Sequence, residues 1–131
     1  FAALDANTTG ADNVAVGAYA LDANTTGDEN TSLGYNSLSD NTTGDNNVAV
    51  GKNALMDATT ASNNTAVGYN ALQYNTTGEQ NTAVGSDALK TITTGGENTA
   101  LGYYALRLSQ TASTKNTCIG YNVKLVMRTL L

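Results

Sequence analysis

The side chains that could do chemistry in this 131-residue chain are few and recur at regular intervals. Histidine is absent and Cys118 is the only cysteine, so the commonest general base, an internal disulfide and a thiolate metal cluster are all excluded. Carboxylates and tyrosines remain, and no acid and base converge in the sequence as a catalytic set. We therefore predict that the protein is not an enzyme and has no catalytic residues.

Acidic residues lie in the short segment between each Thr-Thr-Gly turn and the next Asn: Asp12, Asp28, Glu29, Asp45, Glu79 and Glu97. Stacked carboxylates in the turns of a repeat protein can hold Ca²⁺. These acids, however, alternate between two positions, and Ser62-Asn63 replaces them in the fourth turn. Like charges ~5 Å apart repel by only about 0.8 kcal/mol in water, so a solvated acidic edge explains the pattern. We expect no cofactor or metal, with Ca²⁺ as the less favoured alternative.

Four tyrosines occupy one equivalent position: Tyr35, Tyr69, Tyr103 and Tyr121. Ala18, Lys52 and Ser86 take the same position elsewhere, and such variable occupancy predicts exposure to solvent. Exposed tyrosines suit recognition of a sugar or protein, although they also support sheets and line interfaces. They are our candidates for ligand contact, with a supporting role as the favoured alternative.

A repeat of 17 residues positions all of these side chains. Four columns of equivalent residues define it. A glycine column contains Gly17, Gly34, Gly51, Gly68, Gly85, Gly102 and Gly120. An asparagine column contains Asn13, Asn30, Asn47, Asn64, Asn81, Asn98 and Asn116. A leucine column contains Leu4, Leu21, Leu38, Leu55, Leu72, Leu89 and Leu106. An aliphatic column contains Val16, Leu33, Val50, Val67, Val84, Leu101 and Ile119.

Each repeat reads as a turn, a short β-rich segment, a glycine and a second segment, with no stretch long enough for an isolated helix. This pattern predicts an all-β fold: a parallel β-solenoid, or β-roll, of seven 17-residue coils over residues 1–123. At about 4.8 Å per coil the rod would be roughly 34 Å long. The one-residue delay of Gly120 predicts an extra residue between Ser113 and Asn116. Residues 124–131 would cap the solenoid or begin the next element.

The asparagine column is expected to be structural, since amides one strand spacing apart hydrogen-bond along the axis of a stack. Glycines are expected where the chain reverses or passes close to a neighbouring coil.

Pairs such as Ala66-Val67 predict a solenoid that is apolar on two faces, because neighbours on a strand point to opposite sides. If the alanine faces the narrow lumen, the aliphatic column faces outward, and Cys118 in the alanine column is a small core residue. That outward column would expose on the order of 340 Å², as large as the largest patch on an ordinary monomer. We therefore predict a homo-oligomer with this column at its interface. Valine inside and alanine outside is the alternative that the sequence leaves open.

The charge distribution limits the partners. Residues 1–100 hold all eleven acids against Lys52 and Lys90, and the chain carries a formal charge of −5. Repulsion disfavours nucleic acid, and no apolar run approaches the ~20 residues of a membrane-spanning helix.

The segment Asn64-Thr65-Ala66-Val67-Gly68-Tyr69-Asn70-Ala71-Leu72, with Asn-Thr-Thr-Gly turns at Asn24, Asn41 and Asn75, resembles a known group of repeats. It is similar to the β-roll head repeats of trimeric autotransporter adhesins and to repeats of bacteriophage tail-fibre proteins. The resemblance implies a left-handed coil, a parallel homotrimer and an extracellular location on a bacterial cell surface or virion fibre. It also implies a rigid structural or adhesive segment that contacts a host receptor, matrix protein or glycan.

Paired threonines suggest an alternative of another class, an ice-binding solenoid. They are Thr8-Thr9, Thr25-Thr26, Thr42-Thr43, Thr59-Thr60, Thr76-Thr77 and Thr93-Thr94. An ice-binding surface requires two outward threonines separated by one inward residue, whereas adjacent residues on a strand point in opposite directions. The fibre hypothesis is therefore preferred.

Overall fold

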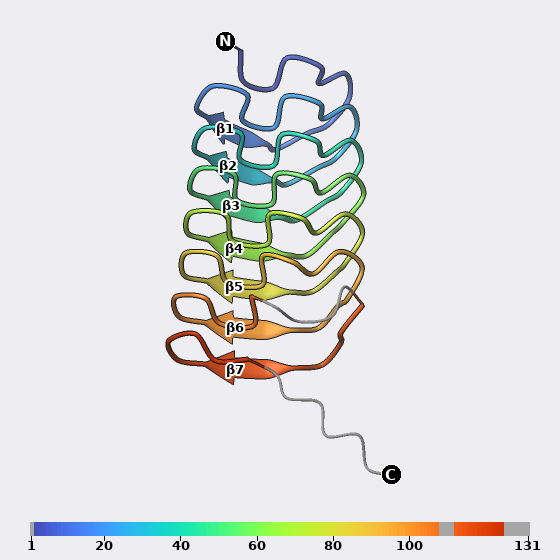
Figure 1. Cartoon of the computed structure of the whole chain (residues 1–131). Coiled ribbons are helices and arrows are strands. Elements are labelled where there is room, and N and C mark those ends of the chain that lie inside the picture. The colour runs from blue at the N-terminus through green and yellow to red at the C-terminus, as the bar shows by residue number, and fades with distance from the viewer. Residues whose placement is uncertain (1, 108–111, 125–131) are drawn as a thin grey trace.

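A computed structural model describes residues 2–107 and 112–124 of the chain. The chain winds as a stack of coils from one end to the other, and each coil contributes one short strand (Figure 1). The strands form a single parallel sheet whose spatial order follows the sequence. Their bounds are β1 Val14–Val16, β2 Thr31–Leu33, β3 Val48–Val50, β4 Thr65–Val67, β5 Thr82–Val84, β6 Thr99–Leu101 and β7 Thr117–Ile119.

The register confirms the predicted parallel β-solenoid with coils of about 17 residues. Val50 of β3 pairs with Val67 of β4, and Val67 pairs with Val84 of β5, so identical positions stack directly. The described residues contain no helix. Equivalent side chains therefore run in columns along the axis.

The one irregular coil lies near the C-terminal end, but the extra residue is not where the sequence suggested. Leu101 pairs with Ile119, a step of 18 residues. Asn98 already reaches the carbonyl of Ser113 at 2.8 Å, one residue further along the chain than Asn81 reaches to Gly95. The extra residue therefore precedes Ser113, and the prediction that it follows Ser113 is wrong. The sequence alone did not distinguish an insertion before Ser113 from one after it, because the residues from Asn116 onward align with the preceding coil in the same way in both cases.

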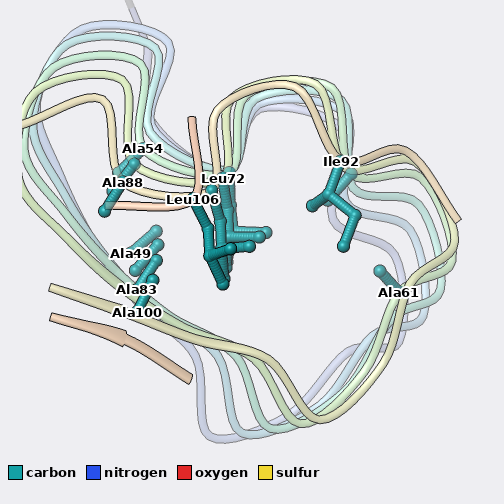
Figure 2. Packing of buried hydrophobic residues seen from close by; sticks show 14 of the residues in the cluster. Ala49, Ala54, Ala61, Leu72, Ala83, Ala88, Ile92, Ala100 and Leu106 are labelled. Carbon is teal, nitrogen blue, oxygen red and sulfur yellow. The ribbon is translucent and has the colours of Figure 1, made fainter. Parts of the chain in front are cut away.

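The core is a narrow lumen filled by small side chains (Figure 2). Strand alanines such as Ala49 and Ala83 face Ala54 and Ala88 across one half, and the leucine column lies between the two halves. Ala61 and Ile92 lie in the other half. The alanines of β3 to β6 and the leucines from Leu21 to Leu89 are fully buried. Alanine thus faces inward and the aliphatic column outward, which resolves the alternative that the sequence left open.

Every leucine of the column has a left-handed backbone, with φ between 50° and 58°. Such a conformation costs an L-residue roughly 1–2 kcal/mol. It is retained because each leucine fills the middle of the lumen, and burying a leucine side chain gives about 1.5–3 kcal/mol. The sharp inward bend of each coil at this point is therefore made by a core residue and not by glycine.

Both glycine columns lie against the backbone of the next coil. Gly68 has φ +134°, and an added Cβ would lie 2.7 Å from the carbonyl carbon and oxygen of Gly85 in the next coil. At Gly44 an added Cβ would lie 2.1 Å from the carbonyl oxygen of Ala61 in the next coil and also 2.5 Å from the Oδ1 of Asn41. That same Oδ1 accepts a hydrogen bond from the Gly44 N–H at 3.1 Å. In the fourth coil the turn begins with Ala58, which carries no such oxygen, and Ala61 replaces the glycine.

A column of buried asparagines links the coils along the axis. The Asn64 amide nitrogen donates to the Asn47 Oδ1 at 3.2 Å and to the Gly78 carbonyl at 2.9 Å. Its Oδ1 accepts from the backbone N–H of Asn81 at 2.9 Å and from the Asn81 amide at 3.2 Å. Each side chain therefore satisfies buried polar groups of both adjacent coils.

Candidate functional site

The strand face is a regular surface to which all seven strands contribute. Each strand presents its first and third residues outward, and the inward residue between them is buried in β2 to β7. The outward aliphatic column is most exposed at its ends, where Val16, Leu101 and Ile119 are 55%, 45% and 67% exposed. Val50 and Val67 in the middle are partly exposed. These side chains, predicted to form an oligomer interface, thus make one continuous apolar strip on the isolated chain.

The outward residue at the start of each strand is threonine in five coils and valine in two: Val14, Thr31, Val48, Thr65, Thr82, Thr99 and Thr117. A column of mostly threonine residues therefore runs beside the aliphatic column, two residues earlier on each strand and on the same face of the sheet. These residues lie two positions before the aliphatic column, so the alternation of a strand predicts that both columns face outward.

The tyrosine column is exposed but interrupted. Tyr103 and Tyr121 stack with ring centroids 5.3 Å apart, whereas Tyr69 has no ring partner among the described residues. A hydrogen bond with Tyr104 raises the pKa of Tyr103 to about 12, with smaller contributions from desolvation and neighbouring charges. The Tyr103 phenol is therefore neutral at physiological pH. Tyr35 lies beneath Lys52, whose ammonium is 5.5 Å from the ring centroid.

The acidic edge uses its carboxylates to hold the backbone. Asp28 accepts a hydrogen bond from the Ala11 N–H at 2.7 Å, and Asp45 accepts one from the Asp28 N–H at 2.8 Å. In the fourth coil the Ser62 hydroxyl replaces the carboxylate and accepts from the Asp45 N–H at 3.0 Å. Within residues 2–107 and 112–124 no three potential metal ligands of the types His, Cys, Asp and Glu cluster.

The paired threonines do not form a double array on one surface. In the first five pairs the hydroxyl of the first threonine donates to the carbonyl of the equivalent threonine in the next coil, as in Thr25 to Thr42 at 2.9 Å and Thr42 to Thr59 at 3.0 Å. The second threonine, such as Thr43, is exposed. In five of the six pairs only the second threonine is exposed, whereas both Thr8 and Thr9 are exposed in the first pair.

Cys118 occupies the position that alanine takes in the preceding strand and pairs in register with Ala100. It is 6% exposed, and its Sγ lies 3.4 Å from the carbonyl of Val123. The side chain is a small residue of the lumen.

One feature was missed by sequence reasoning: a groove on the outer side of the first three coils. Each coil bends inward at its leucine (Figure 2), and the residues that line the groove come from before and after this bend. The groove has a volume of about 450 Å³. Its lining residues are Tyr19, Asp22, Ala23, Tyr35, Asn36, Ser39, Asp40 and Met56. We call it the tyrosine–aspartate groove. Its residues lie at different positions of the repeat, so no single column of the sequence points to it.

Comparison of the chain with protein-family models, curated proteins and solved structures found no match. The family relationship suggested by the repeats therefore stays an expectation. No helix with the length and apolarity needed to cross a membrane occurs in the part of the chain that the structure describes.

Proposed function

We propose that the protein is a structural, non-enzymatic fibre segment that self-associates through its strand face. The observation that carries this proposal is the continuous outward aliphatic column over all seven strands. An apolar strip of this length on a soluble chain favours a partner that covers it. The repeats' resemblance to adhesin heads and tail-fibre proteins supports the same function, and adds an extracellular location and contact with a host surface.

The number of chains in the proposed oligomer, three, comes from the resemblance to adhesin heads. The strip measures roughly 34 Å by 10 Å, or about 340 Å² per chain. Two such strips would bury about 680 Å² against each other, below the ~1,200 Å² at the lower end of stable interfaces. Three strips around a common axis would all be covered at once. Parallel alignment would superpose equivalent coils, so each chain would meet the same aliphatic side chains along its full length.

Sedimentation velocity over a range of protein concentrations tests the proposal. The expected species has a mass of about 40 kDa, three times the 13.4 kDa of one chain. The double substitution Val50→Lys and Val67→Lys places two charges at the centre of the strip and should give a folded monomer. The control Thr43→Lys with Thr60→Lys adds the same two charges at exposed turn residues outside the strip and should leave the trimer intact. A wild-type chain that stays monomeric at high concentration would contradict the proposal.

A second candidate function is binding to ice, and the strand face favours it more than the paired threonines do. Outward threonine and outward aliphatic residues alternate with one inward residue between them, at a spacing of about 4.8 Å along the axis. Such a regular array of hydroxyl and methyl groups can order water in a lattice. Measurement of thermal hysteresis decides between the candidates: a monomer with strong activity supports ice binding, and a trimer without activity supports the fibre segment.

A further inference from the structure

The C-terminal coils place their own cations across the inward bend. In the fifth coil the Lys90 ammonium lies 3.0 Å from the Asp87 carboxylate and 5.9 Å from the ring centroid of Tyr74. In the sixth coil the Arg107 guanidinium carbon lies 4.4 Å from the ring centroid of Tyr104. In both coils the cation follows its partner by three residues and spans the leucine bend. The fold thus has a position where a cationic group rests against a carboxylate or an aromatic ring.

The first coil has an aspartate at the repeat position of these cations. Tyr19 occupies the repeat position of Tyr104, with φ 59° against 57°, and Asp22 occupies the position of Arg107. The ring of Tyr19 meets the ring of Tyr35 edge to face, with centroids 5.8 Å apart and planes at 88°. In the sixth coil the guanidinium of Arg107 covers this position. In the first coil the equivalent position lies in the tyrosine–aspartate groove.

The charge of the groove is negative. Asp22 and Asp40 line it, and neither takes part in an ion pair: the described residues contain two, Lys90–Asp87 and Lys115–Glu97. Burial and, to a lesser extent, the nearby Asp40 charge raise the pKa of Asp57 in the next coil. The nearby cation, Lys52, rests over Tyr35 and does not line the groove.

We propose that the tyrosine–aspartate groove binds an organic cation, a guanidinium or primary ammonium group, in the place that Arg107 and Lys90 fill in the later coils. Carboxylates and tyrosine faces are the groups that hold such a cation, through charge-assisted hydrogen bonds and cation–π contact. The source is either an Arg or Lys side chain of a partner polypeptide or a free polyamine. None of the residues that line the groove belongs to a strand, so binding can be tested separately from the proposed association of the strand faces.

The test is an NMR titration of the full chain with three probes: the blocked peptide Gly-Arg-Gly, its neutral citrulline analogue, and spermidine. We expect the arginine peptide to shift the resonances of Tyr19 and Tyr35, with a dissociation constant on the order of 1 mM or tighter. The citrulline analogue should bind at least tenfold more weakly. Stronger binding of spermidine than of the peptide would assign the free amine as ligand, and the reverse order would assign the side chain. Equal binding of the arginine and citrulline peptides, or no shift with either cation, would overturn the proposal.

Two variants locate the site. Asp22→Asn with Asp40→Asn should weaken binding at least tenfold, whereas the control Glu29→Gln with Glu79→Gln removes two exposed carboxylates elsewhere and should change it less than twofold. Asp22→Arg should fill the groove with an internal guanidinium over Tyr19, as Arg107 lies over Tyr104, and abolish binding. Loss of affinity that is equal in the two double variants, or binding that survives Asp22→Arg, would refute the site. Far-UV circular dichroism establishes that each variant is folded.

Discussion

Removal of one central amide from the asparagine column should cost far more stability than removal of the same amide from the last coil. In Asn64→Ala the buried backbone N–H of Asn81 loses its acceptor, the Asn64 Oδ1 at 2.9 Å. An unsatisfied buried donor costs about 1–3 kcal/mol. The lost bonds to the Asn47 Oδ1, the Gly78 carbonyl and the Asn81 amide add roughly 0.5–1.5 kcal/mol each. The total is about 2.5–7.5 kcal/mol.

Asn116→Ala is the matched control, because Asn116 has the same register but accepts no bond from a following coil among the described residues. It loses one bond, from its amide to the Asn98 Oδ1 at 2.8 Å, and that acceptor keeps the Asn116 N–H at 3.0 Å. The expected cost is about 0.5–1.5 kcal/mol. Urea unfolding followed by far-UV circular dichroism measures both free energies. If Asn64→Ala costs less than about 1 kcal/mol, or no more than Asn116→Ala, the column does not link the coils as described.

Three further predictions concern the turns and charges. Gly68→Ala should lower the free energy of unfolding by about 2–5 kcal/mol, because the new Cβ adds backbone strain and overlaps with Gly85. Gly120→Ala is the control: its Cβ would meet only the side chain of Val123, at 3.1 Å, so it should cost only the strain of about 1–2 kcal/mol. Equal losses in urea unfolding would argue against the overlap. Ala58→Asn alone should destabilise the chain, but Ala58→Asn combined with Ala61→Gly should stabilise it by roughly 1 kcal/mol. In the double variant the new Oδ1 at position 58 can accept a hydrogen bond from the N–H at position 61, as the Asn41 Oδ1 does from the Gly44 N–H. A double-mutant cycle without coupling would disprove this prediction. Burial acts to raise the pKa of Asp87, but hydrogen bonds from Lys90 and Asn70 outweigh it and lower the pKa. The resulting stability is present above the unfolded pKa of about 3.9 and is lost as the pH falls through the lower folded value, so Asp87→Asn should destabilise the chain at pH 7 and approach the wild type on acidification. Asp57→Asn is the contrasting variant, because the pKa of Asp57 is raised and its loss should not destabilise the chain at pH 7; parallel pH profiles for the two variants would contradict the assignment.

The repeat was enough to predict the fold because stacking identical segments in register is the simplest arrangement that buries the same face of each. The spacing of Gly51, Gly68 and Gly85 gave the coil length, and pairs such as Ala66-Val67 gave two opposite faces. The sequence could not place the extra residue of the seventh coil, because residues 113–116 fit the turn of the repeat whether the insertion lies before or after Ser113.

The candidate site was harder to predict, since its residues belong to different columns. Asp22 and Tyr35 come from separate coils, and only the inward bend at Leu21 makes a groove of their surroundings. That bend was not predicted, because a left-handed conformation is unusual for leucine and no local preference points to it.

The sequence by itself therefore determined the periodic part of the molecule: the coil length, the parallel stack and the columns of equivalent residues. Only the tertiary structure decided which way alanine faces, which glycines avoid an asparagine side chain, and where the outer surface is hollow. The physical reason is that periodicity fixes contacts between equivalent residues of successive coils. Contacts across one coil depend on the path of the backbone. The leucines set that path, because they fill the lumen while their own backbone takes the unfavourable left-handed conformation.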